Sequence, residues 1–64
     1  MKIAEKIEKL DHLLTIDELA ALTSFSPKTL YSKVKAGTIP TTRISGSLRF
    51  DPGLIATWLR AKTA

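Results

Sequence analysis

Residues 15–50, TIDELAALTSFSPKTLYSKVKAGTIPTTRISGSLRF, decide the fold of this chain. The stretch predicts, in order, a helix, a short turn, a basic helix and a basic hairpin. None of the chain's six acidic residues lies within 19–50. Five basic residues do: Lys28, Lys33, Lys35, Arg43 and Arg49. A basic stretch without carboxylates favours binding to a polyanion.

Capping signals predict where the first helix of this stretch begins. Thr15 and Glu18 have the spacing of a capping box, in which each side chain bonds the backbone amide of the other residue. Leu14 before the cap and Leu19 at the fourth helical position have the spacing of a hydrophobic staple. We therefore expect a helix that starts after Thr15 and ends at about Leu22.

The second helix has its own start and stop signals. Ser26 and Pro27 provide an N-cap followed by proline at the first helical position, where the missing amide proton costs nothing. Leu30 and Val34, four residues apart, are predicted to face the core. Gly37 suits the left-handed residue that ends many helices. The expected helix is short and carries its lysines on the outward face.

Two short runs of strand-forming residues flank Ser45-Gly46-Ser47 and predict a hairpin. A three-residue loop would pair Arg43 with Arg49 and place both arginines on the solvent face. A two-residue loop, Ser45-Gly46, would shift the pairing by one residue. The sequence leaves both registers open, and the register decides whether the arginines project together.

Amphipathic helices are predicted on both sides of this region. Ile3, Ile7, Leu10 and Leu14 follow helical spacing, and we divide the chain into an N-terminal helix, residues 1–13, and a second unit, residues 14–62. This apolar stripe covers either the rest of the domain or a second copy of the chain.

Asp51 and Pro52 predict another capped helix start, for a closing helix that runs to about Lys62. Its apolar face is expected to comprise four residues: Leu54, Ile55, Trp58 and Leu59. Trp58 shares this stripe, so we interpret it as a core residue rather than a stacking platform.

Size and composition argue against catalysis. A chain of 64 residues forms one domain with little room for a deep pocket. No phosphate loop, dinucleotide glycine pattern or paired His/Cys/Asp cluster is present, and His12 is interpreted as a surface residue. We expect no enzyme activity, no cofactor and no metal. Because the chain has no cysteine, signal peptide or apolar span, we expect an intracellular protein.

Four segments together resemble a known family: residues 14–20 (LTIDELA), 26–31 (SPKTLY), 37–40 (GTIP) and 47–51 (SLRFD). In this order and spacing they are similar to the excisionase-type, MerR-like winged helix-turn-helix proteins of phages, plasmids and integrative elements. The resemblance covers about residues 13–60. It implies a mainly α fold with a small β-hairpin, the wing, in which the second helix of the helix-turn-helix enters the major groove.

The resemblance also implies which residues contact DNA. On the second helix these are Lys28, Thr29, Ser32, Lys33 and Lys35, with Tyr31 at the boundary of the outward face. In the wing they are Arg43, Ser45, Gly46, Ser47 and Arg49. Lysine and arginine can bind phosphates or guanine, and arginine does so bidentately. Tyr31 packed against the protein, Thr29 supporting the helix start and a solvated arginine face are the structural alternatives.

We therefore expect a sequence-specific duplex DNA-binding protein without cofactors. The resemblance implies that it is a cytoplasmic, nucleoid-associated protein of a bacterium or phage. The resemblance implies an excisionase, which directs recombination, or a transcriptional regulator of a mobile genetic element. Its partners would be DNA, an integrase or RNA polymerase, and further copies of itself on DNA, with no membrane contact. The alternative is a protein-interaction adaptor, antitoxin-like or integrase-docking, whose basic strip meets an acidic protein.

Overall fold

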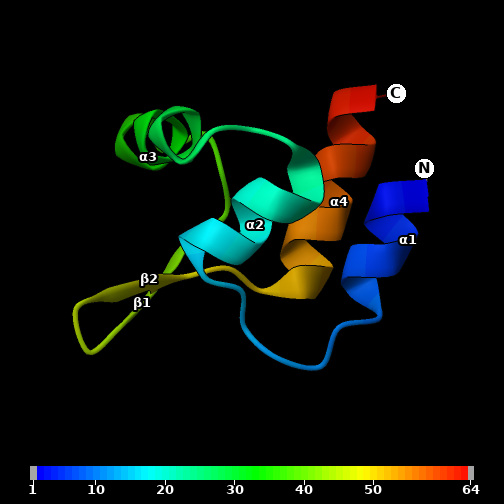
Figure 1. Cartoon of the computed structure of the whole chain (residues 1–64), viewed down its shortest axis with the longest axis horizontal. Coiled ribbons are helices and arrows are strands. Elements are labelled where there is room, and N and C mark those ends of the chain that lie inside the picture. Colours follow the sequence, from blue (N-terminus) through cyan, green and yellow to red (C-terminus); the bar gives the residue numbers. More distant parts are fainter. Residues whose placement is uncertain (1, 64) are drawn as a thin grey trace.

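The computed structural model describes residues 2–63. Within them, the elements follow in the order α1 (Lys2–Glu8), α2 (Ile16–Thr23), α3 (Pro27–Ala36), β1 (Thr42–Ile44), β2 (Ser47–Arg49) and α4 (Pro52–Thr63). Figure 1 shows α3 and the hairpin at one end of the molecule, α1 and α4 at the other, and α2 between them. The predicted fold class, mainly α with a small β-hairpin wing, is confirmed.

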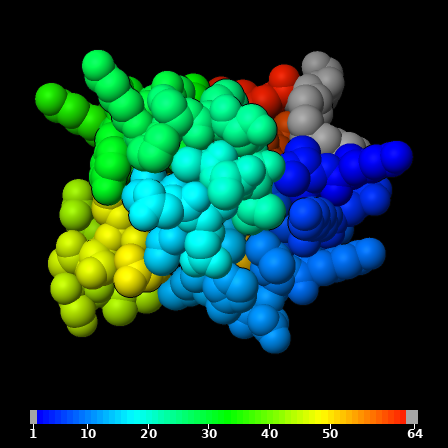
Figure 2. Space-filling model, viewed as in Figure 1, coloured from blue at the N-terminus to red at the C-terminus, as the bar shows by residue number. Residues whose placement is uncertain are grey.

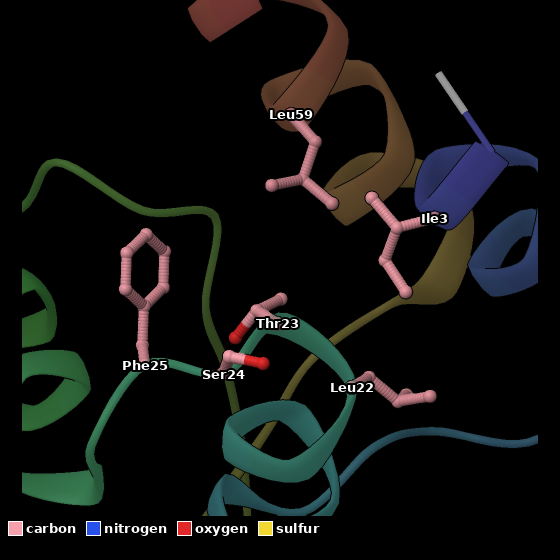
Figure 3. Close-up of a pocket in the computed structure, with 6 residues that line it drawn as sticks. All are labelled: Ile3, Leu22, Thr23, Ser24, Phe25 and Leu59. Carbon is pink, nitrogen blue, oxygen red and sulfur yellow. The ribbon is translucent and has the colours of Figure 1, made fainter.

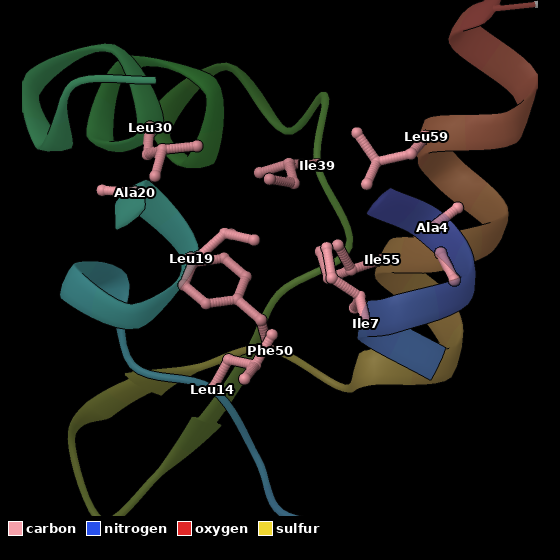
Figure 4. Packing of buried hydrophobic residues seen from close by; sticks show 11 residues of the cluster. Ala4, Ile7, Leu14, Leu19, Ala20, Leu30, Ile39, Phe50, Ile55 and Leu59 are labelled. Atoms are coloured by element: carbon pink, nitrogen blue, oxygen red, sulfur yellow. The ribbon is translucent and has the colours of Figure 1, made fainter. Parts of the chain in front are cut away.

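One apolar core joins these elements (Figure 4). Side chains from all four helices described meet Phe50, which follows the hairpin. The largest fully buried side chains are Phe50, Ile7, Leu14, Leu19, Leu30 and Ile55. Since an aromatic side chain buries more apolar area than an aliphatic one, Phe50 at the centre of this cluster is the main apolar contribution of the hairpin segment to stability.

Both helices of the central pair begin where their caps predict. The Thr15 hydroxyl accepts the Glu18 amide at 3.1 Å, and the Glu18 carboxylate accepts the Thr15 amide at 3.1 Å, so the capping box is complete. At α3, Ser26 Oγ accepts the Thr29 amide at 3.2 Å. Gly37, with φ 73°, ends α3 in the left-handed conformation. These local signals fix both ends of the second helix.

The first helix is shorter than the spacing of its apolar residues predicts. It ends at Glu8, and the Leu10 amide donates to the Ile7 carbonyl at 3.0 Å as the chain leaves the helix. Leu14 lies in extended backbone instead, where its amide and carbonyl pair with those of Phe50 at 2.8 and 2.9 Å. This pairing needs extended backbone, so the helix cannot continue to residue 13.

The stripe on α1 packs on the chain's own core. Ala4 and Ile7 are fully buried, and α1 lies against α4 (Figure 1). At the exposed edge of this pair the Arg60 guanidinium donates two hydrogen bonds to the Glu8 carboxylate, at 2.9 and 2.8 Å. The same hydrogen bonds lower the pKa of Glu8 and raise that of Arg60. Of the two predicted roles for the stripe, covering its own domain is the one observed.

The hairpin adopts the two-residue loop. Arg43 pairs with Leu48, and Thr42 pairs with Arg49. Ser45 and Gly46 both have positive φ, 51° and 81°, as the tight hairpin turns that match strand twist require. Residues opposite one another share a face, and successive residues alternate, so Arg43 and Arg49 lie on opposite faces of the hairpin. The arginines do not project together.

The closing helix is rotated relative to its predicted apolar face. Leu54 is 53% exposed, and Ala56 takes a place in the core beside Ile55 and Leu59. Leu54 was therefore wrongly included in the core face. Trp58 is half-buried at the edge of the core, where its indole N–H donates to the Thr38 carbonyl at 2.8 Å. This bond ties α4 to the segment that follows α3.

The α2–α3 turn contains a residue whose backbone favours glycine. Ser24 caps α2 with φ 63° and ψ 13°, a left-handed conformation that is costly for residues with a Cβ. We expect Ser24→Gly to raise the free energy of unfolding by about 0.5–1 kcal/mol in urea titrations. Ser32→Gly, within the exposed face of α3, is the matched control and should lower it by about 0.5 kcal/mol. Equal effects of both variants would contradict the conformational explanation.

Candidate nucleic-acid interface

The outward face of α3 is polar and accessible. Figure 2 shows long side chains of α3, in green, standing out from the surface at the end that also carries the wing. The exposed residues of this face are Lys28, Thr29, Tyr31, Ser32 and Lys35. Opposite them, Leu30 is fully buried and Val34 packs against the core. Burial of Leu30 thus fixes which side of the helix is offered to a partner.

Two residues of α3 have specific local partners. Lys33 is half-buried, and its ammonium lies 5.8 Å from the centroid of the Phe25 ring in the turn before the helix. Thr29 accepts a hydrogen bond from the Ser26 hydroxyl at 2.9 Å, while its own hydroxyl proton remains available to an acceptor. Lys33 therefore points back along the helix, and Thr29 both supports the helix start and faces solvent.

A hollow of about 350 Å³ lies between α3, the wing and the start of α2. It brings together five of the residues predicted to contact DNA: Tyr31, Arg43, Gly46, Ser47 and Arg49. Leu48 lies among them, and none of the described residues that line the hollow carries a carboxylate. Tyr31 and both arginines line this hollow, although the arginine side chains leave the hairpin on opposite faces, and a hydroxyl and a guanidinium are donors suited to a phosphate. The remaining predicted residues of α3, and Ser45 at the wing tip, lie outside it.

The two wing arginines occupy different environments. Arg43 is exposed, whereas Arg49 is half-buried and its Nη1 donates to the carbonyl of Leu48 at 2.7 Å. This bond holds the Arg49 side chain against the strand and occupies one of its five N–H donors. Arg43 is consequently the wing cation with the greater freedom to reach a ligand.

Three residues of the hollow lie outside the predicted set: Leu48, Thr15 and Ile16. Thr15 and Ile16, at the start of α2, line the hollow beside the wing. The sequence shows Thr15 only as a helix cap. The backbone pair between Leu14 and Phe50 places it next to Arg49, and no local pattern reveals a contact between segments so far apart in the chain.

The arrangement of two short helices, a basic hairpin and a closing helix has a counterpart among known families. The model of a helix-turn-helix domain family matches residues 13–63. The chain belongs to this family. None of the curated proteins and none of the solved structures matches the chain. Membership of the helix-turn-helix family supports a DNA-binding role for this domain.

The start of α2 in this helix-turn-helix domain carries a small charged cluster. His12 Nε2 lies 2.9 Å from Glu18 Oε2, and His12 Nδ1 lies 3.7 Å from Asp11 Oδ1. The hydrogen bond with Glu18 raises the pKa of His12 above its ordinary 6.5, and Asp11 adds to the effect. The same bond, with that from the Thr15 amide, lowers the pKa of Glu18 below 4.5. His12 and Glu18 lie six residues apart, on either side of the Thr15 cap. This spacing matches neither the helix period nor the strand period, so the sequence does not predict the pair.

Residues 2–63 contain no group of three or more His, Cys, Asp or Glu side chains that could hold a metal ion. No helix described in the structure combines the length and apolar character of a membrane span.

The His12–Glu18 pair predicts how stability depends on pH. Because the folded pKa of His12 is raised, its contribution is complete below about pH 6.5 and is lost as the pH rises through the folded value. Because the pKa of Glu18 is lowered, its contribution is lost as the pH falls below about 4.5. We expect the melting temperature to be highest between these values, and His12→Gln to flatten the alkaline side. An unchanged pH profile in His12→Gln would contradict this assignment.

Proposed function

We propose that this protein binds duplex DNA sequence-specifically through α3 and the wing and has no chemistry of its own. The observation that carries the proposal is the hollow that Tyr31 of α3 lines together with Arg43 and Arg49 of the wing. A DNA strand that passes the N-terminal half of α3 would bring a phosphate to these donors. Among residues 2–63, none that lines the hollow carries a carboxylate, which favours a polyanion there.

In this proposal, the exposed face of α3 reads base edges in the major groove. Lys28 can donate to guanine O6 or N7 or to a phosphate, and Thr29 offers a hydroxyl and a methyl group that can contact thymine. Lys35 lies in the last turn of α3, where it contacts the phosphate backbone of the DNA. Base discrimination therefore falls on the first turn of α3, while the wing and Tyr31 fix the register on the backbone.

The resemblance to excisionase-type, MerR-like proteins supports a role in a mobile genetic element. The protein would act as a recombination directionality factor or as a transcriptional regulator, in the cytoplasm of a bacterial cell. An integrase would be the protein partner in the first role and RNA polymerase in the second. One domain of this size offers a small DNA interface, so self-association on DNA forms part of the proposal.

Selection from a random duplex library at physiological salt is the direct test of sequence-specific binding. We expect the bound pool to be enriched in a motif, because base contacts from α3 distinguish sequences. We also expect the logarithm of affinity to fall with the logarithm of salt concentration with a slope of about −4 to −5, as for about four to six phosphate contacts. No enrichment, with no retention even at low salt, would favour the protein-interaction adaptor.

Substitutions in the wing and in α3 should affect different properties of DNA binding. Arg43→Ala with Arg49→Ala should weaken binding to all sequences alike and reduce the salt slope by about two, since each arginine neutralises about one phosphate. Lys28→Ala or Thr29→Ala should change the enriched motif instead. Lys6→Ala, at an exposed position in the last turn of α1, is the control and should alter neither. A wing variant with wild-type affinity would remove the wing from the interface.

A further inference from the structure

We propose that the protein associates with further copies of itself by docking an exposed leucine of one copy into an apolar groove of the next. The groove, about 340 Å³ in volume, is lined by Ile3, Leu22, Thr23, Ser24, Phe25 and Leu59. Figure 3 shows Ile3 and Leu59 on one side, Phe25 on the other, and Thr23 and Ser24 between them. The inference deepens the proposed function by giving its self-association a surface, but its test needs no DNA.

The groove is apolar in its lining and basic around its edge. Phe25 is 38% exposed, and the Lys33 ammonium lies 5.8 Å from its ring centroid. On α4, the Lys62 ammonium lies 5.7 Å from the ring of Trp58, the residue before Leu59. Lys2 precedes Ile3 in the chain. The groove therefore suits an apolar side chain that is flanked by carboxylates.

Most acidic residues lie at the helix ends that are far from the groove. The groove lies where α1 begins, α2 ends and α4 approaches its end. Acidic residues gather at the opposite ends of these helices: Glu8 in the last turn of α1, Asp17 and Glu18 in the first turn of α2, and Asp51 before α4. Two acidic residues remain: Glu5, in the first turn of α1, is the exception to this distribution, and Asp11 lies in the loop after α1.

The loop between α1 and α2, residues 9–13, has the complementary chemistry. Leu13 is 38% exposed, although it lies beside the fully buried Leu14. Asp11 is fully exposed, and His12 brings the Asp11 and Glu18 carboxylates close to the loop. Lys9 at the start of the loop offsets one of these charges. The loop therefore presents an apolar side chain with two carboxylates, and with Lys9 and the His12 ring as its cationic groups, whereas the edge of the groove carries lysines.

The placement of the two surfaces fixes the symmetry of the contact. In Figure 1 the loop lies at the bottom of the molecule, whereas the start of α1 and the α2–α3 turn lie toward the top. A surface and its partner at opposite ends produce a heterologous contact, which joins copies head to tail into an open row or a ring. The α3 and wing side faces left in the same view, so stacking in this direction leaves it uncovered on every copy.

The contact is small, so it should be weak in free solution. DNA that holds copies side by side would raise their effective concentration and make the same contact significant. We therefore expect amide NMR shifts of the free protein to move with concentration in the millimolar range. The shifts should be confined to the groove, residues 3, 22–25 and 59, and to the loop, residues 11–13. A spectrum without any concentration dependence would overturn the proposal.

Substitution of exposed leucines tests which side chain docks. Leu13→Ser should weaken the association about tenfold, because it removes the apolar anchor. Leu54→Ser is the matched control, since Leu54 is also exposed and lies outside both surfaces. It should leave the association unchanged. The amide spectra themselves report whether both variants fold. Wild-type association in Leu13→Ser, or equal losses in the two variants, would overturn the proposal.

Mixing distinguishes a heterologous contact from a symmetric one. Labelled Leu13→Ser retains an intact groove, so excess unlabelled wild-type protein should shift its groove resonances and leave its loop resonances in place. Shifts at the loop instead would mean that loops pair with each other and would overturn the assignment. Because no DNA is present, these results stand apart from the outcome of the library selection.

Discussion

The backbone pair between Leu14 and Phe50 is the constraint on which the rest of the structure depends. Two hydrogen bonds, 2.8 and 2.9 Å long, join the segment before α2 to the end of the hairpin, and both side chains are fully buried. An isolated hairpin with strands of three residues is at best marginally stable in water. The pair anchors this hairpin to the core and fixes where α2 and α4 begin, since Thr15 and Asp51 follow its two members directly.

Local chemistry explains why so much of the fold can be predicted from the sequence. A capping box, a proline after an N-cap or a glycine at a helix end acts within a few residues, so the bounds of α2 and α3 follow from Thr15, Ser26 and Gly37. The first helix is different, because the pairing of Leu14 with Phe50 overrides a spacing that also fits a helix. Leu54 shows a related limit: apolar character places a residue near a core face, but packing decides the rotation.

The candidate site could be predicted only in part, for the same physical reason. The identities of its cations follow from composition and resemblance, but their relative directions depend on the hairpin register. That register places Arg43 and Arg49 on opposite faces of the hairpin. The Arg49 side chain is held by its hydrogen bond to Leu48, so it is less mobile than that of Arg43. Thr15 belongs to the same hollow through tertiary pairing alone. Contacts between distant segments therefore decide which of the predicted residues can act on one ligand.

Two turns beside the proposed interfaces contain a serine in a strained backbone conformation. Ser24 lies in the turn between α2 and α3, and Ser45 lies at the tip of the wing. Both have positive φ, which costs a serine conformational energy that a glycine would not lose. Such outliers persist where the surrounding structure holds them, and they point to function at the strained position. At the wing tip, the Ser45 hydroxyl adds a donor next to Gly46, which lines the hollow. Ser24 lines the apolar groove, where its hydroxyl keeps a polar atom between Thr23 and Phe25. Each serine thus lowers the stability of its turn, and each turn borders one of the two proposed binding surfaces.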